Sequence, residues 1–281
     1  MIVAAVQMDI AIGEVDHNLQ RICDFLDETS GRKAHLTVFP ECAVTGYCFQ
    51  SREEGMQFAQ TIPGPATDRV AQSCAARRTY AVFGMLERHE DKLFNAAVLI
   101  GPDGLLASYR KIHLPYLGID RFTDYGDRPF SVHDAGGIQV GMNICYDASF
   151  PESARCLTLL GADLVVLPTN WPPGAECVAR STIQSRAIEN GIYFVATNRV
   201  GTEAGFPFIG RSQICSPQGD VVMASADSEE IIVAEIDLSL ARRKRIVRAD
   251  GAHQIDRLAD RRPEFYEPIT AAHNRRTPRQ D

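Results

Sequence analysis

The sequence predicts an α/β protein, a four-layer α-β-β-α sandwich with two pseudo-symmetric halves. One observation is that strand, helix and hairpin signals occur in the same order twice along the chain. Another is that the two halves contain similar segments: residues 35–40 read HLTVFP and residues 163–168 read DLVVLP. A third is that no Gly/Ser-rich linker separates the halves. The two halves are therefore expected to form one domain.

The first half follows a strand–helix–strand plan that ends in a hairpin. Residues 16–29 are expected to be helical because Leu19, Ile22, Cys23 and Leu26 recur at helical spacing. The turn sequence at residues 101–104, Gly-Pro-Asp-Gly, predicts the hairpin. The expected elements are strands at 2–8, 36–39 and 80–85, helices at 16–29 and 67–78, and a hairpin of 94–100 and 105–109.

The second half repeats this order. A second turn tetrad, Ser-Pro-Gln-Gly at residues 216–219, again predicts a hairpin. The expected elements are strands at 138–144, 164–167 and 193–196, helices at 152–160 and 176–188, a hairpin of 208–215 and 221–224, and a last strand at 231–236.

This order of strands, helices and hairpins predicts the layers of the fold. Strand–helix–strand units give mixed sheets with helices on one face, and each sheet then has a bare face to cover. Stacking the bare faces together gives the sandwich. We expect a single domain over residues 1–250 and a C-terminal arm over 251–281, frayed or at a subunit interface. The basic run at 241–248 is interpreted as a solvated helical face, with a tail that crosses to another subunit as the alternative.

Composition excludes several classes of function. The 281 residues are 45% hydrophobic and 23% charged, so a large core is available. A net charge of −7 argues against nucleic acid or an anionic membrane as a partner. The sequence contains no run of eighteen apolar residues, and its start lacks a basic signal region. We expect a cytoplasmic protein.

The metal-binding and redox residues are dispersed. Eight cysteines show no C-x-x-C pair, and seven histidines show no ligand spacing. The cysteines are expected to be reduced and mostly buried. No metal and no cofactor are expected, and the absence of G-x-G-x-x-G after a strand disfavours an oxidoreductase.

Cys145 is the first chemical candidate. An apolar strand pattern ends at this thiol, and Asp147, Ser149 and Pro151 then signal a helix start. A thiol on such a turn lies near helix-start N–H groups, which favour a thiolate. The alternative is a buried cysteine that packs as a small hydrophobic residue.

Two more chemical groups occur at predicted strand ends. Glu41 directly follows Pro40, which closes a buried strand, and a partly buried carboxylate has the raised pKa that suits a general base. Lys111 follows the first hairpin, and alternation places it on the same face as Tyr109. Together with Cys145 they provide a base, an oxyanion partner and a nucleophile.

These residues resemble the nitrilase, or carbon–nitrogen hydrolase, superfamily. The matching pieces are FPE at 39–41 with GY at 46–47, YRKIHL at 109–114, NICYD at 143–147 with FPE at 150–152, GAD at 161–163 through PTNW at 168–171, RAIEN at 186–190, and FIGRS at 208–212 with PQG at 217–219. The resemblance implies the same sandwich, a Glu–Lys–Cys site, and homodimers or higher assemblies with crossing C-terminal tails.

The family also usually carries a second glutamate after the lysine, and this chain departs from that pattern. The loop at 115–122 contains no glutamate, and Asp120 is the nearest substitute. The alternative role for Asp120 is to cap a local turn. Both interpretations stay open at this point.

The resemblance implies hydrolysis of a small amide through a cysteine thioester with release of ammonia. Glu41 would take the thiol proton, while Lys111 and the Tyr146 N–H would hold the oxyanion. Asn170 and Trp171 follow a strand of the second half and are candidates for positioning the substrate. A carboxamide is preferred, and an N-carbamoyl compound or a nitrile is the alternative. Specificity is expected to reside in loops 42–49, 116–122 and 171–177.

Two rival hypotheses remain open. His113 lies two residues from Lys111 and is the base of a Cys–His hydrolase in one of them. The other is a non-catalytic assembly subunit that retains the fold. The retention of Glu41, Lys111 and Cys145 argues against the second.

Overall fold

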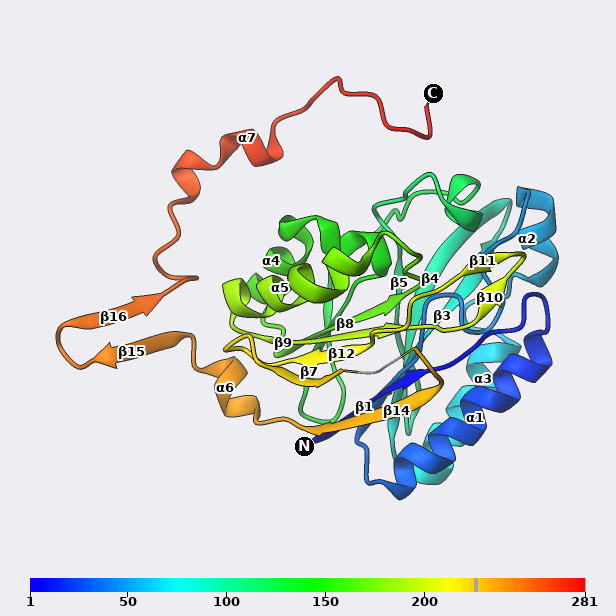
Figure 1. The fold of residues 1–281 in the computed structure, drawn as a ribbon, viewed down its shortest axis with the longest axis horizontal. Helices are drawn as coiled ribbons and strands as arrows, with labels where there is room; N and C mark the ends of the chain where they lie inside the picture. The colour runs from blue at the N-terminus through cyan, green and yellow to red at the C-terminus, as the bar shows by residue number, and fades with distance from the viewer. Residues whose placement is uncertain (225–226, 281) are drawn as a thin grey trace.

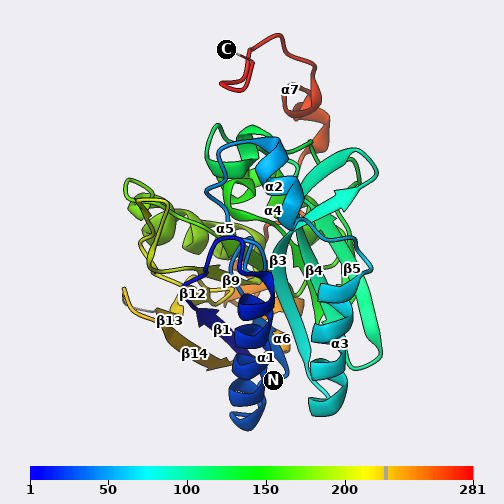
Figure 2. The same cartoon turned by 90° about the vertical axis from the view of Figure 1, so that its right-hand side faces the viewer.

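Two six-stranded sheets form the centre of the protein, as seen in a computed structural model that describes residues 1–224 and 227–280 (Figures 1 and 2). The first sheet has the order β14-β1-β2-β3-β4-β5 and the second β13-β12-β9-β8-β7-β6. The first comprises β1 (Ile2–Gln7), β2 (Leu36–Val38), β3 (Tyr80–His89), β4 (Lys92–Gly101), β5 (Gly104–Arg110) and β14 (Glu230–Glu235). The second comprises β6 (Val132–Asp134), β7 (Gln139–Met142), β8 (Leu164–Thr169), β9 (Tyr193–Asn198), β12 (Gln213–Cys215) and β13 (Val221–Ala224).

Strand pairing repeats between the sheets. Strands β1, β2 and β3 run parallel, as do β7, β8 and β9, and the flanking strands are antiparallel. One strand crosses between the two halves: β14 follows the second half in sequence but pairs with β1 of the first sheet. This pairing connects the two halves in one structure.

Alternating side chains of the first sheet separate its two faces. Val82 and Leu99 belong to the core between the sheets, whereas Phe83 and Ile100 pack with α1 (Val15–Gly31) and α3 (Pro65–Arg77). Helices α4 (Pro151–Leu159) and α5 (Ile183–Asn190) pack against β7 and β9 of the second sheet, and their buried Leu157 and Ala187 belong to one apolar cluster that is continuous with the residues between the sheets. Burial of these apolar faces from water stabilises the stack. The predicted four-layer sandwich is confirmed.

Two elements of the second half differ from the prediction. The helix expected at 176–188 begins as expected at Glu176 but contains a π-helical turn at Val178–Thr182 before it continues as α5. Of the strand expected at 208–215, only Gln213–Cys215 forms a strand in the described structure, β12. The residues before it bend out of the extended conformation, because Gly210 and Arg211 have φ of 59° and 63°. Before that bend lies a short hairpin of β10 (Thr202–Glu203) and β11 (Phe206–Pro207).

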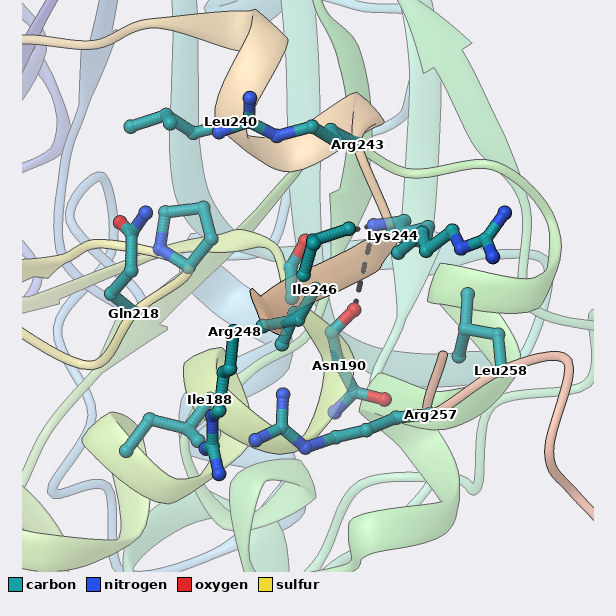
Figure 3. Close-up of a pocket in the computed structure, with 14 residues that line it drawn as sticks. Ile188, Asn190, Gln218, Leu240, Arg243, Lys244, Ile246, Arg248, Arg257 and Leu258 are labelled. Carbon is teal, nitrogen blue, oxygen red and sulfur yellow. Dashed lines mark hydrogen bonds between the residues drawn. The ribbon is translucent and has the colours of Figure 1, made fainter. Parts of the chain in front are cut away.

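The basic run at 241–248 is not a helical face, so that interpretation was wrong. Helix α6 (Leu238–Arg242) ends within the run, and β15 (Arg245–Ala249) pairs with β16 (His253–Asp256) in a hairpin. The Lys244 ammonium donates to the Gly191 carbonyl at 2.8 Å and the Asn190 carbonyl at 3.4 Å, and Figure 3 shows it beside the end of α5. A cation there satisfies carbonyls that a helix end leaves without partners.

The C-terminal arm extends away from the sandwich and then returns (Figure 1). It contains a 3₁₀ turn at Pro263–Phe265 and the short α7 (Glu267–Thr270), with Phe265 and Ile269 largely exposed. Near its end, the Arg279 guanidinium donates to the Thr123 carbonyl at 2.6 Å. The arm therefore contacts the sandwich again beside the loop that contains Asp120.

Candidate active site

Glu41 lies at the turn that follows β2. Its side chain is fully buried, and the turn packs directly against Gly84 of β3. A Cβ atom at Gly84 would lie 2.4 Å from the Cys42 nitrogen and 2.6 Å from the Glu41 Cα. Glycine at this position therefore lets the turn approach the sheet and holds the carboxylate at the strand end.

Lys111 directly follows β5 and meets two carboxylates. Its ammonium lies 2.7 Å from Glu41 Oε1 and 2.5 Å from Asp120 Oδ2, and the three side chains are shielded from solvent. Burial opposes the charge on Lys111, but Asp120 and Glu41 outweigh it and hold its pKa well above the usual value. Asp120 lies in a 3₁₀ turn, Gly118–Arg121, yet its carboxylate is directed to the lysine.

Two further residues complete this cluster, and sequence reasoning missed both as site residues. The Asn95 amide donates to Glu41 Oε1 at 2.7 Å and to Asp120 Oδ1 at 2.9 Å. The Tyr47 hydroxyl donates to Asp120 Oδ2 at 2.9 Å. Asn95 is the one amide within the apolar run of residues 93–100, LFNAAVLI, and this isolated polar residue was the available signal.

Cys145 occupies a strained turn between β7 and α4. Its φ is +43°, a left-handed conformation that non-glycine residues rarely adopt, and such strain is common at functional sites. Its neighbours Asn143 and Ile144 are buried, and the residue itself is 8% exposed. The predicted strand–turn–helix geometry is therefore present.

The expected thiolate is not favoured at Cys145. Burial and then the charge of Glu41 raise the pKa of the thiol to about 12, and Lys111, Thr169 and the Asn170 N–H only partly offset this. The helix-start environment is outweighed by desolvation. The thiol therefore needs a base to remove its proton.

Glu41 has the properties of such a base. Burial raises its pKa to about 7, opposed by the positive charge of Lys111. Within the described part of the chain, its Oε2 is buried and has no hydrogen-bond partner, whereas Oε1 is held by Lys111 and Asn95. One carboxylate oxygen is thus available to a proton, and its charge acts on the Cys145 thiol.

Of the three residues near the thiol that were considered for substrate positioning, two are buried and one has an exposed side chain. Asn170 follows β8, its backbone N–H interacts with the Cys145 sulfur, and its buried side-chain amide has no partner among the described residues. Trp171 is 3% exposed and packs in the same core as Cys145. Tyr146 directs its side chain outwards, at 39% exposure, and contacts the ring of Phe150 edge-on.

His113 is engaged with Asp147 instead of the thiol. Its Nδ1 lies 2.7 Å from Asp147 Oδ1, and its ring stacks on Phe150 with centroids 3.8 Å apart. Asp147 also accepts a hydrogen bond from Tyr109. This arrangement gives His113 a partner outside the Glu41–Lys111 cluster.

Two of the loops expected to determine specificity meet at a cavity of about 250 Å³. Tyr47 and Cys48 line it from one loop, and Tyr116 and Arg121 from the other. Arg121 places one guanidinium there, with its Nε donating to the Gly118 carbonyl at 3.0 Å. The cavity also shares Tyr47 with the Asp120 cluster.

No group of three or more His, Cys, Asp or Glu side chains in the described residues is arranged to hold a metal ion. No helix in the described part of the chain is long and apolar enough to span a membrane.

The family model for carbon–nitrogen hydrolases matches residues 2–246. The chain belongs to this family. It is 43% identical over 266 residues to a nitrilase of Pyrococcus abyssi, covering 94% of this chain and 98% of that protein. It is 33% identical over 239 residues to an (R)-stereoselective amidase of Pseudomonas sp., with 85% of each chain covered.

Solved structures of this superfamily share the fold. An amidase from Nesterenkonia sp. superposes with a TM-score of 0.80 at 27% identity, covering 96% of both chains. In a mutant of that amidase, acrylamide has added covalently to the active-site cysteine. The family relationship confirms that this protein is a thiol-dependent carbon–nitrogen hydrolase, as the sequence predicted.

Proposed function

We propose that this carbon–nitrogen hydrolase cleaves a small carboxamide and releases ammonia, with Cys145 as nucleophile, Glu41 as base and Lys111 as oxyanion partner. The observation that carries the proposal is the buried Oε2 of Glu41, which has no hydrogen-bond partner among the described residues, while the charge of Glu41 acts on a thiol whose proton must be removed. A carboxylate with a pKa of about 7 is matched to proton transfer near neutral pH.

Acylation follows from this charge arrangement. Glu41 takes the Cys145 proton as sulfur attacks the amide carbon, so no free thiolate accumulates. The oxyanion then forms near Lys111, which has three N–H donors and uses two on Glu41 and Asp120. The backbone N–H of Tyr146 is the second proposed donor.

Breakdown reverses the proton transfer. Protonated Glu41 gives its proton to the leaving nitrogen, ammonia departs and a Cys145 thioester remains. Glu41 then deprotonates a water molecule, which attacks the thioester and releases the carboxylic acid and the thiol. Asp120 contributes by holding Lys111, in the place where the family usually carries a second glutamate.

The proposed substrate is short. Asn170 offers a buried amide with donor and acceptor atoms that other described residues do not use, which suits a carboxamide group. Trp171 limits the space around Cys145. Carboxamide attack reaches a tetrahedral oxyanion at once, whereas a nitrile must first pass through a thioimidate.

An N-carbamoyl acid is the second candidate. The observation that favours it is Arg121, a guanidinium at the cavity formed by the two specificity loops, which could receive a carboxylate. Nitrile hydrolysis ranks below both.

The test is ammonia release from propionamide, N-carbamoyl-β-alanine and propionitrile at equal concentration, for wild type and Cys145→Ala. Turnover of propionamide by wild type alone supports the proposal. Turnover of only the nitrile or only the carbamoyl acid would refute the carboxamide assignment. Wild-type activity in Cys145→Ala would refute the assignment of Cys145 as the nucleophile. Intact mass after mixing should show an acyl adduct on one cysteine.

We further propose that the protein is a homodimer or a multiple of one, with residues 251–281 as an arm at the subunit interface. The support is the exposure of Phe265 and Ile269 on an arm that extends from the sandwich. A cavity of about 420 Å³ at the base of the arm is lined by Lys244, Arg248 and Arg257, and a second negatively charged chain would complement it (Figure 3). Light scattering that gave a mass near 31.0 kDa would contradict this proposal.

A further inference from the structure

Asp147 is a fully buried carboxylate that the proposed mechanism does not use. It lies two residues after Cys145, in the 3₁₀ turn Cys145–Ser149. Both of its oxygens are occupied. Oδ2 accepts from the Ile144 N–H at 2.8 Å and the Tyr109 hydroxyl at 2.8 Å, and Oδ1 accepts from the His113 N–H at 3.1 Å and lies 2.7 Å from His113 Nδ1.

These partners come from two segments that contain the reacting groups. Ile144 directly precedes Cys145, whereas Tyr109 and His113 lie two residues before and two residues after Lys111. Asp147 therefore joins the turn that holds the thiol to the segment that holds the ammonium. The two segments follow β5 and β7, which belong to different sheets, so this carboxylate connects the two sheets at the site.

Asp147 also closes the Cys145 turn on itself. Its N–H donates to the Ile144 carbonyl at 3.0 Å, while its side chain accepts the Ile144 N–H, so the two residues bracket the nucleophile. Cys145 is held at φ +43°, and a conformation of this kind persists only where surrounding contacts determine it. Asp147 supplies two of those contacts.

The orientation of His113 is fixed from two sides. The Ile144 and His113 backbone N–H groups both donate to Asp147, and we assign a hydrogen on His113 Nδ1 to the third contact, so that Asp147 acts as acceptor to each of them. The opposite constraint is Phe150, which stacks on the ring at 3.8 Å. Phe150 itself directly precedes α4, so the stack connects His113 back to the segment that follows Cys145.

We propose that Asp147 and His113 form a positioning pair that sets the thiol of Cys145 relative to the ammonium of Lys111, with His113 acting as a hydrogen-bond donor and not as the catalytic base. The proposal rests on the proposed roles of Cys145 and Lys111 and adds two residues to them. Displacement of a reacting group by about 1 Å can cost on the order of a hundred-fold in rate, so loss of this bridge has a measurable effect.

The test compares two replacements of His113. His113→Asn keeps a side-chain N–H near the position of Nδ1 but cannot serve as a base, whereas His113→Leu removes the donor. We expect kcat/KM for propionamide to fall by about tenfold or more in His113→Leu and to stay within about threefold of wild type in His113→Asn. His133→Leu, a second-sheet histidine bonded to Ser131, is the control and should behave as wild type.

A second readout does not depend on amide turnover. The rate of Cys145 alkylation by iodoacetamide, followed by intact mass, should fall in His113→Leu and recover in His113→Asn. In a double-mutant cycle, Asp147→Asn combined with His113→Leu should cost less than the sum of the single changes. Thermal unfolding of each variant separates these effects from a general loss of fold.

The outcomes separate the hypotheses. If His113→Asn is as inactive as His113→Leu, His113 performs acid–base chemistry and the proposal is wrong. Wild-type rates of both turnover and alkylation in His113→Leu would also overturn it. If wild type hydrolyses no amide but alkylation follows the expected pattern, the proposed substrate class fails while the positioning pair stands.

Discussion

The ammonium of Lys111 lies 2.5 Å from a carboxylate oxygen of Asp120, in a site closed to solvent. This contact is consistent with the proposal that Asp120 takes the role of the second glutamate that the family usually carries. The negative charge of Asp120 has two effects there: it holds Lys111 charged, and it raises the pKa of Glu41. The arrangement leads to predictions about pH, charge and stability.

Activity should depend on pH through Glu41. As the proposed base, Glu41 is competent only as a carboxylate, and its pKa of about 7 lies far above that of a free glutamate. We expect kcat/KM to fall as pH decreases through about 7, with one proton taken up. A pH–rate profile from 5 to 9 measures this, and a profile flat through that region would exclude Glu41 as the base.

Asp120→Asn should move that acidic limb to lower pH. Removal of a negative charge near Glu41 favours its ionised form, so its pKa falls. We also expect a rate loss of about tenfold, because Lys111 loses a charged partner. Asp124→Asn, in the same loop but paired with Arg52, is the matched control. An acidic limb at the wild-type position would show that Asp120 does not act on Glu41.

Lys111→Met should reduce both activity and stability. Loss of the oxyanion partner is expected to cost on the order of 3 kcal/mol, or roughly a hundred-fold in rate. The two buried carboxylates left without their cation should destabilise the fold by about 3–5 kcal/mol. Adding Asp120→Asn should restore part of the stability measured by denaturant unfolding, but not the activity. Wild-type stability of Lys111→Met would contradict the buried pairing.

Cys145→Ala should abolish turnover and leave the fold intact, because the residue is the proposed nucleophile and its side chain is small. Cys156→Ala, which removes an exposed thiol on α4, should behave as wild type.

Glu41→Gln should impair acylation. A burst of ammonia from Glu41→Gln would place the base elsewhere.

Arg279→Ala should loosen the segment that follows Asp120. The guanidinium donates to the carbonyls of Thr123 and Arg121 and stacks on Tyr125 at 4.7 Å. We expect faster hydrogen exchange at residues 118–125, measured by mass spectrometry, because these contacts are lost. Arg275→Ala, an exposed position of the same arm, is the control. Equal exchange in the two variants would show that the arm does not hold this loop.

The sequence by itself determined the layers and was sufficient to propose three candidate reacting groups. Helical spacing at Leu19, Ile22 and Leu26, and strands that end shortly before Pro40 and Cys145, are local patterns that the structure reproduces. Residue type and position were sufficient to select Glu41, Lys111 and Cys145, because each follows a strand and each provides a distinct chemistry.

Only the tertiary structure decided how these groups act. The contacts of Asn95 and Tyr47 with Asp120 join segments that no local pattern relates. The state of Cys145 depended on burial and on the charge of Glu41, which outweigh the helix-start N–H groups that the sequence indicated. The basic run at 241–248 had a composition compatible with a helix, yet its second part pairs as β15 with β16. Pairing partners, desolvation and charge proximity are long-range quantities, and they arise only when the chain is folded.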